Sequence, residues 1–400
     1  MKRFNPFKRK TSPYKITDKV RVRKSYYTFS EEYPADRFHI SRRKKLLSKR
    51  RKAHIVLSVF AFTLIFLLSY FAMSVSLSVS NSPIENNSSE SSLDTSLSDK
   101  LKEEGIKALY MPSGKLSDKG YIKSFIYEIE RKNGNAVVID FKNAEGKLSY
   151  TSFQNYAIMG RCNLLDNDTV RKAVNTFTDS GITVIARIYC FEDPIVSEAV
   201  PEIAVKYMDT DVNWRDTKSE NGHSWLNPVS KRARNYLYGI VGELYAMNIK
   251  GFMLESVQFP DGAKNGATYP GEKDSGKRNE ILINFVDTVK KKLPKDAIVI
   301  LSESASDASN GNEEIYFGSL SGSSAFAVAA DTRERDENIL LDKREKFSSL
   351  ISMYGEISRR YPKKTVIPII SMEEYSRSYI RNIKRSGYTS YILIDENGNY

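Results

Sequence analysis

The chain has 400 residues, of which 40% are hydrophobic and 11% aromatic, which is enough apolar material for one large globular domain or two ordinary ones. Its net charge of +12 is unevenly distributed: residues 1–53 carry 19 Lys and Arg against 4 Asp and Glu, a net of +15, which leaves 42 against 45, a net of −3, for residues 54–400. A nearly neutral remainder argues against a folded domain that binds nucleic acid through a basic surface.

An apolar segment follows the basic tail 1–53. No Asp, Glu, Lys or Arg occurs between Ala53 and Ile84, and a helix needs roughly 20 apolar residues to cross the hydrocarbon core of a bilayer. We therefore predict a transmembrane helix over residues 54–77. The Lys and Arg clusters just before it predict a cytoplasmic N-terminus, which makes the chain a single-pass protein of a cell membrane with its C-terminal part outside.

A cleaved signal peptide is the nearest alternative to this anchor, because Ser74-Val75-Ser76 offers small residues where a peptidase could cut. The basic region is far too long for a signal peptide, and the apolar stretch exceeds the usual length, so we favour an uncleaved anchor. Beside a membrane, the basic tail is expected to attract anionic lipid headgroups, and no nucleic-acid partner is expected.

A serine-rich segment separates the anchor from the rest of the chain. Eleven of the 25 residues from Ser74 to Ser98 are serine, and this composition buries too little apolar surface to order itself. Residues 78–100 are therefore predicted to be a linker, and residues 101–400 a domain displayed beyond the membrane.

Eight short runs rich in β-branched and apolar residues follow, and we interpret each as a strand. They are Ile106–Met111, Asn135–Phe141, Thr183–Phe191, Gly251–Ser256, Ala297–Ser304, Ala325–Asp331, Thr365–Ser371 and Ser390–Asp395.

Amphipathic helical stretches separate most of these runs. They are Lys119–Lys132, Thr169–Ser180, Ser230–Met247, Lys277–Lys292, Leu341–Tyr361 and Glu373–Arg385. Strands that alternate with helices indicate parallel βα units, and eight of them predict an α/β fold of the TIM type, a (β/α)8 barrel. A doubly wound open sheet is the second choice, because no glycine-rich phosphate fingerprint follows the first strand.

Two irregularities are expected in this barrel. The segment between the fifth and sixth strands is poor in apolar residues, so one helix there is expected to be degenerate. Only five residues follow Asp395, which leaves no last barrel helix, and Leu93–Glu104 could pack in its place.

Carboxylates stand where several strands end. In a barrel the C-terminal strand ends converge on one site, and glycoside hydrolysis needs two carboxyl groups, one as acid and one as nucleophile or base. Glu255 and Glu303, at the ends of the fourth and fifth strands, form the most natural catalytic pair, with Glu255 as nucleophile or base and Glu303 as acid. Asp331 and Asp395 more often serve a structural purpose at such positions.

Other residues of these regions are candidates for binding. Arg187 lies inside an apolar run, where a guanidinium demands an anionic partner or ligand. Both tryptophans, Trp214 and Trp225, fall in the long loop after the third strand, and indole faces can stack on sugar rings or simply pack the loop onto the barrel. Cys162 and Cys190 match no metal-binding spacing, and one disulfide or two thiols are both compatible with the sequence. No metal site or cofactor is predicted.

Several ordered motifs resemble one family, the putative glycosyl hydrolase domain of bacterial envelope proteins, over roughly residues 105–400. They are Asn135-Ala136-Val137-Val138-Ile139-Asp140-Phe141-Lys142, Ile185-Ala186-Arg187-Ile188, Phe191-Glu192-Asp193-Pro194, Trp214-Arg215-Asp216, Trp225-Leu226-Asn227-Pro228 and Val257-Gln258-Phe259-Pro260.

The resemblance implies a carbohydrate-active barrel. It also implies that the residues matching the family pattern line the substrate site: Asp140, Lys142, Arg187, Asp193, Trp225 and Asn227. The chain departs from the family pattern in the fourth and sixth strands. In and just after the fourth strand, Glu255, Ser256 and Gln258 replace an aspartate, a tyrosine and an arginine of the family. Gln258 and Trp214 complete the expected binding set.

The resulting hypothesis is a membrane-anchored glycoside hydrolase that acts on cell-envelope or extracellular polysaccharide outside a bacterial cell. In it, Asp140 and Arg187 orient the sugar beside the carboxylate pair. The alternative is a catalytically inactive barrel that binds a glycan or a protein partner in envelope assembly, because fold alone does not determine function.

Overall fold

The computed structural model describes residues 97–216, 222–260, 266–304, 323–331, 343–372 and 377–395. The basic tail, the predicted membrane helix 54–77 and most of the predicted linker lie outside these ranges. Among the described residues, no helix combines the length and the apolar character that a membrane span requires.

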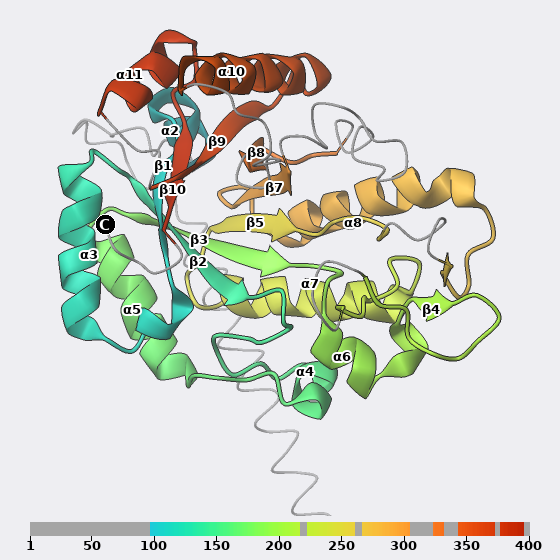
Figure 1. Cartoon of the computed structure of the whole chain (residues 1–400). Helices are drawn as coiled ribbons and strands as arrows, with labels where there is room; N and C mark the ends of the chain where they lie inside the picture. Colours follow the sequence, from blue (N-terminus) through green and yellow to red (C-terminus); the bar gives the residue numbers. More distant parts are fainter. Residues whose placement is uncertain are drawn as a thin grey trace, which may run out of the picture. The chain divides into compact units, whose positions relative to one another are not determined.

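Eight parallel strands close into a barrel in the order β1-β10-β9-β8-β7-β5-β3-β2, as Figure 1 shows. Their bounds follow the eight predicted runs closely, so the predicted TIM-type barrel is confirmed. The strands are β1 (Lys107–Met111), β2 (Ala136–Lys142), β3 (Thr183–Tyr189), β5 (Gly251–Glu255), β7 (Ile298–Ser304), β8 (Ala327–Asp331), β9 (Thr365–Ser371) and β10 (Tyr391–Ile394). A separate antiparallel pair, β4 (Lys206–Tyr207) and β6 (Ala267–Thr268), lies in the loops.

Helices surround the barrel in Figure 1. The six predicted helices appear as α3 (Lys119–Arg131), α5 (Asn167–Asp179), α7 (Lys231–Tyr245), α8 (Arg278–Lys292), α10 (Lys343–Arg360) and α11 (Arg377–Arg385). Shorter elements are α2 (Leu97–Glu104), α4 (Asn155–Gly160), α6 (Pro194–Ala199) and the 3₁₀ turns Ser113–Lys115, Pro201–Ile203 and Ser275–Lys277.

The strands bury side chains on both faces, which is why they read as continuous apolar runs. One cluster gathers alternate residues from every barrel strand and is the barrel interior, because side chains of a strand alternate between its faces. Its strand members are Ala108, Tyr110, Ala136, Val138, Ile185, Met253, Ile298, Ile300, Ala327, Ala329, Ile367, Ile369, Ile392 and Ile394. We call this set the inner layer.

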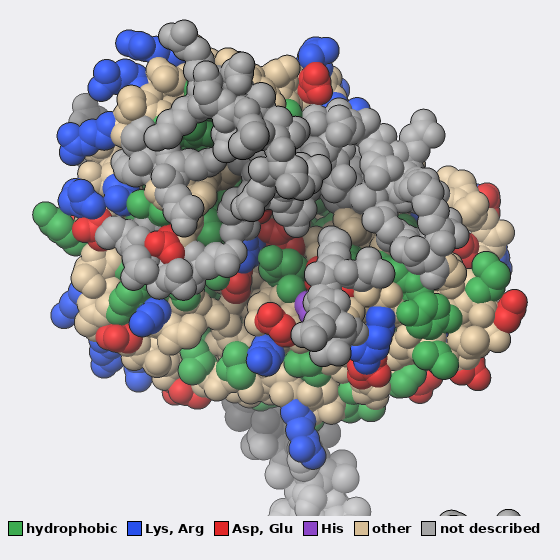
Figure 2. All heavy atoms as spheres, in the orientation of Figure 1, with side chains coloured by type: hydrophobic (Ala, Val, Ile, Leu, Met, Phe, Trp, Pro, Cys, Tyr) green, Lys and Arg blue, Asp and Glu red, His purple; other side chains and the backbone are tan. Residues whose placement is uncertain are grey.

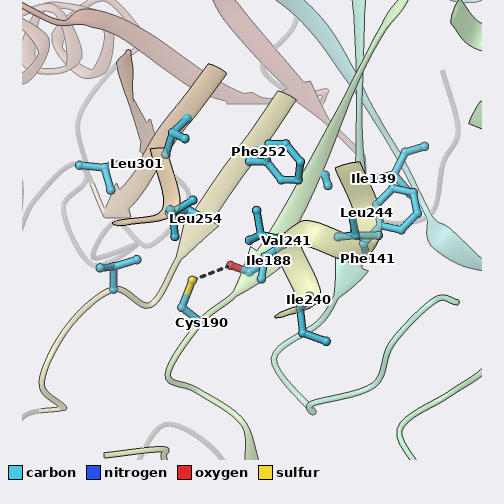
Figure 3. Close-up of a cluster of buried hydrophobic side chains, with 14 of the residues drawn as sticks. Ile139, Phe141, Ile188, Cys190, Ile240, Val241, Leu244, Phe252, Leu254 and Leu301 are labelled. Atoms are coloured by element: carbon cyan, nitrogen blue, oxygen red, sulfur yellow. Dashed lines mark hydrogen bonds between the residues drawn. The ribbon is translucent and has the colours of Figure 1, made fainter. Parts of the chain in front are cut away.

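The intervening residues pack outward against the helices and form the larger cluster. Figure 3 shows part of this cluster, in which Leu244 of α7 lies beside Ile139 and Phe141 of β2. Phe252 and Leu254 of β5 and Leu301 of β7 belong to the same cluster. The two apolar layers hold the strand ends rigidly, which suits them to carry a site.

The N-terminal helix α2 differs from its expected place. Leu101 of α2 belongs to the inner layer, and Leu97 packs against the same layer. The segment Leu93–Glu104 was expected to replace a missing outer helix, whereas α2 packs on the inner layer of the barrel. The helix also begins at Leu97, inside the segment predicted as linker. The expected degenerate helix between β7 and β8 lies outside the described residues.

Candidate active site

The inner layer ends in polar residues at the C-terminal end of the barrel. Asp140, Arg187 and Glu255 each follow an inner-layer residue by two positions, after Val138, Ile185 and Met253, and so face the interior as well. Ser302 of β7 and Asp331 of β8 continue the same rows. In Figure 2, acidic side chains lie near the middle of the displayed face, whereas Lys and Arg gather toward α3 and α11.

A buried ion pair joins β2 to β3. The guanidinium of Arg187 donates from Nη2 to Oδ2 of Asp140 over 2.9 Å and from Nε to Oδ1. The Tyr110 hydroxyl donates to the same Oδ2 over 2.9 Å. The guanidinium carbon lies 5.0 Å from the ring centre of Tyr110 and 5.3 Å from that of Tyr189, within the range of cation–π attraction. Arg187 thus has the anionic partner that its burial demanded, and its position is rigid.

Glu255 lies beside this pair. Its Oε1 is 3.9 Å from Nη1 of Arg187, and its side chain is 15% exposed. Burial, helped by the charges of Asp331 and Asp140, raises the pKa of Glu255 to about 7 against the opposing charge of Arg187. Glu255 therefore exchanges its proton near neutral pH, which is a property of catalytic carboxyl groups.

The chain turns sharply after Glu255. Ser256 has a φ of 51°, a left-handed conformation that costs a non-glycine residue of order 1 kcal/mol or more. Its hydroxyl donates to Oε2 of Glu192 over 3.0 Å, and Oε1 of Glu192 lies 2.7 Å from Nδ1 of His223. These contacts fix the turn and connect Glu255 to the loops after β3.

Two predicted binding residues form a structural ion pair instead. The Lys142 side chain has no exposed surface and lies 3.1 Å from Oδ2 of Asp193, which is equally buried. The ammonium also donates to the carbonyls of Tyr189 and Glu192, and Asp193 caps α6 by accepting from the amide of Val196. A β-bulge after Asp140 shifts the register of β2, so Lys142 serves the framework and is not accessible to a sugar.

The tryptophans and Asn227 are buried as well. Trp214 and Trp225 are each 1% exposed, so neither indole face is open to a sugar ring, and the expected stacking role is not supported. Trp225 donates from Nε1 to Asp216 over 2.9 Å, and Asn227 bonds the carbonyl of Pro270 and the amide of Val229. These residues pack the loop onto the barrel, which was the other interpretation of the tryptophans.

The remaining predicted residues are Gln258, Glu303 and the two cysteines. Gln258, in the segment after β5, is 9% exposed. Glu303 lies in β7 opposite Ala330 of β8, and its side chain falls outside the described part of the structure. Cys162 and Cys190 are free and buried, and burial raises the pKa of the Cys162 thiol to about 12.

Several site residues escaped the sequence analysis. Tyr110 and Tyr189, which flank Arg187, read as ordinary strand residues, and Ser302 was noted only as a neighbour of Glu303. Asp331 was expected to be structural, yet its charge raises the pKa of Glu255. The two-residue alternation along each strand groups Tyr110 and Ser302 with the site only after the inward face of the strand is known.

Glu192, Asp216 and His223 form a further group beside the turn at Ser256. Each offers one potential ligand atom, and these atoms all lie within 4.8 Å of one another. They are the residues in the described part of the chain that could hold a metal ion together.

One family of known proteins matches the chain. Residues 108–305 match the family described as a putative glycosyl hydrolase domain. The matched segment runs from β1 through β7 and includes Asp140, Arg187 and Glu255. The family recognised in the sequence is thereby confirmed.

Among solved structures, the chain is similar to a hypothetical protein from Ruminiclostridium thermocellum ATCC 27405, with 26% identity, coverage of 48% of this chain and 96% of that one, and a TM-score of 0.41. A GH18 chitinase from Pseudoalteromonas aurantia shows 11% identity, coverage of 72% and 92%, and a TM-score of 0.45. A GH20 exo β-N-acetylglucosaminidase from Vibrio harveyi shows 12% identity and a TM-score of 0.44, and the match covers 66% of this chain but only 41% of that enzyme. No curated protein matches the chain.

Proposed function

We propose that this protein hydrolyses glycosidic bonds and that Glu255 is its general acid. The observation that carries the proposal is the environment of Glu255, an inward-facing carboxyl at the end of β5 whose pKa is raised to about 7 by burial. A carboxyl group that holds its proton near neutral pH can protonate the leaving oxygen of a glycosidic bond. The sequence favoured Glu255 as nucleophile or base, and the raised pKa favours the acid role.

The mechanism needs a second, ionised carboxylate. Asp331 is the candidate, because it continues the inward row of β8 and its charge raises the pKa of Glu255. Glu303, the partner expected from the sequence, stands one position after Ser302 on β7 and so outside the inward row of that strand. Asp331 would attack the anomeric carbon or activate a water, depending on its separation from Glu255.

Asp140 and Arg187 would bind the sugar. Their bidentate pair, with the Tyr110 hydroxyl, presents fixed polar groups beside Glu255. Because these groups are already oriented by one another, little side-chain entropy is lost when a sugar hydroxyl bonds to them. Positioning of this kind brings the glycosidic oxygen to the acid.

We propose that the enzyme acts on cell-envelope or extracellular polysaccharide from the outer side of a bacterial membrane. The support is the sequence, in which the basic tail 1–53, the apolar segment 54–77 and the serine-rich linker precede the barrel. In this arrangement the tail contacts anionic lipid headgroups and the tether allows the barrel to reach glycan near the membrane.

The decisive experiment measures release of reducing ends from purified envelope glycan by the full chain in detergent. Glu255→Gln is expected to lower the rate on glycan roughly 10²–10⁴-fold, the usual contribution of a positioned acid. On an aryl glycoside with a good leaving group the loss should be far smaller, since that group departs without a proton. Equal losses on both substrates would remove Glu255 from the acid role.

A variant of Asp331 tests the second catalytic group. Asp331→Asn, which removes the ionised partner, should lose activity on glycan and aryl glycoside alike. Asp274→Asn, at the cap of a 3₁₀ turn before α8, is the control. Glycan binding without product release by the wild-type chain would instead support the inactive, glycan-binding barrel.

A further inference from the structure

The group Glu192, Asp216 and His223 combines one imidazole with two carboxylates from different parts of the loops after β3. Nδ1 of His223 lies 2.7 Å from Oε1 of Glu192. The His223 side chain is 26% exposed and that of Glu192 is 10% exposed. The potential ligand atoms of the three residues lie within 4.8 Å of one another, so a single ion could bind all three, and solvent can reach them.

The contacts around this group resemble an outer coordination shell. Trp225 donates from Nε1 to Oδ2 of Asp216 over 2.9 Å, and the Ser256 hydroxyl donates to Oε2 of Glu192 over 3.0 Å. Asp216 also accepts from the backbone amide of His223 through Oδ1 over 2.8 Å. Outer partners of this kind orient carboxylate ligands before an ion arrives and are a regular feature of protein metal sites.

We propose that Glu192, Asp216 and His223 bind a divalent transition-metal ion such as Zn²⁺. One imidazole and two carboxylates suit a borderline ion of this class, and three protein ligands leave a position for water. Ca²⁺ and Mg²⁺ prefer oxygen ligands alone, so the imidazole selects against them. The ion takes the place of the hydrogen bond between Nδ1 of His223 and Glu192, and the neutral imidazole that binds it carries its proton on Nε2.

The ion would hold the loop that carries Asp216 and His223 against the end of β3. It would also restrain the turn after Glu255, because Ser256 is bonded to Glu192. The proposal concerns binding and does not rest on the hydrolytic activity, so a protein without glycosidase activity could still bind the ion.

The test is calorimetric titration of the full chain in detergent with Zn²⁺, after treatment with a chelator. We expect one Zn²⁺ per chain, with Ca²⁺ in excess failing to compete. The affinity should fall at least tenfold in His223→Ala, Glu192→Gln and Asp216→Asn, and roughly 10–100-fold in Trp225→Phe, which removes an outer partner. Co²⁺ used in place of Zn²⁺ should give an absorption band in the wild type that is lost in His223→Ala.

The matched controls are His39→Ala and His54→Ala, because the chain has three histidines and the other two should leave the titration unchanged. Near-ultraviolet circular dichroism without metal checks that the variants of Glu192, Asp216 and His223 keep the packing of Trp214 and Trp225. If His223→Ala loses that packing, the Zn²⁺ affinities of the isosteric variants Glu192→Gln and Asp216→Asn test the proposal in its place. Absence of saturable Zn²⁺ binding, or equal affinity in these variants and the wild type, would overturn the proposal and leave a plain hydrogen-bonded cluster.

Discussion

Replacing Glu255 by Gln should make the protein more stable at alkaline pH. The carboxyl group is largely buried, and burial raises its pKa from 4.5 to about 7. A carboxyl whose pKa is higher in the folded state binds its proton more tightly there than in the unfolded state. Its contribution to stability is therefore complete below pH 4.5 and is lost as the pH rises through about 7.

The magnitude follows from the size of the shift. Each pKa unit corresponds to about 1.4 kcal/mol, so ionised Glu255 lowers the free energy of unfolding by about 3 kcal/mol above neutral pH. At about pH 5 the same group costs only about 1 kcal/mol, because it is protonated in the folded state. Gln has nearly the same shape and carries no charge.

Thermal unfolding at about pH 5 and about pH 8 measures this difference. We expect Glu255→Gln to raise the unfolding midpoint at the higher pH by roughly 5–10 °C, and much less at the lower pH. The control is Glu145→Gln, an exposed glutamate in the loop after β2, which should change neither midpoint. An equal effect of Glu255→Gln at both pH values would show that Glu255 does not carry the raised pKa, and the acid role would lose its support.

Three further outcomes follow from the same contacts. Lys142→Met should lower the free energy of unfolding by about 3–5 kcal/mol, because it leaves Asp193 buried without a cation; denaturant titration measures this, and adding Asp193→Asn should recover part of the loss. Ser256→Gly should stay within about 1 kcal/mol of the wild type, because glycine accepts the positive φ, whereas Ser256→Val should unfold at a clearly lower temperature. If the protein is a hydrolase, its rate on glycan should fall as the pH rises through about 7, where Glu255 loses its proton, and a rate that is flat across this range would contradict the assignment.

The barrel could be predicted because its local signals agree. Each predicted strand is a short apolar run. The ends of every barrel strand lie within one or two residues of the predicted ends. Helix starts are also encoded locally, since Asp118, Asp166 and Ser230 cap α3, α5 and α7 through their side chains. The position of α2 could not be predicted, because a short amphipathic helix has the same sequence pattern whether its apolar face packs on the inner layer of the barrel or on the outer face of the strands.

The loop residues were harder to interpret than the strands. A tryptophan on a binding surface and a tryptophan that anchors a loop have the same sequence signature, and only the packing of Trp214 and Trp225 distinguishes the two. Likewise, Lys142 and Asp193 lie 51 positions apart, and no local pattern announces that they neutralise each other. Long-range pairing of this kind is decided by tertiary contacts, which one sequence does not display.

The site residues divide according to a single property, the face of the strand on which they fall. Along β5, Phe252 and Leu254 pack against the helices while Met253 faces the interior, and both faces are apolar, so the sequence does not reveal which alternate set points inward. Once Met253 is known to be inside, Glu255 must follow it there. The same count brings Arg187 inward from Ile185, and the bulge in β2 sends Lys142 to Asp193 instead. The family motif therefore mixes residues that face the site with residues that support the framework, and strand parity separates them.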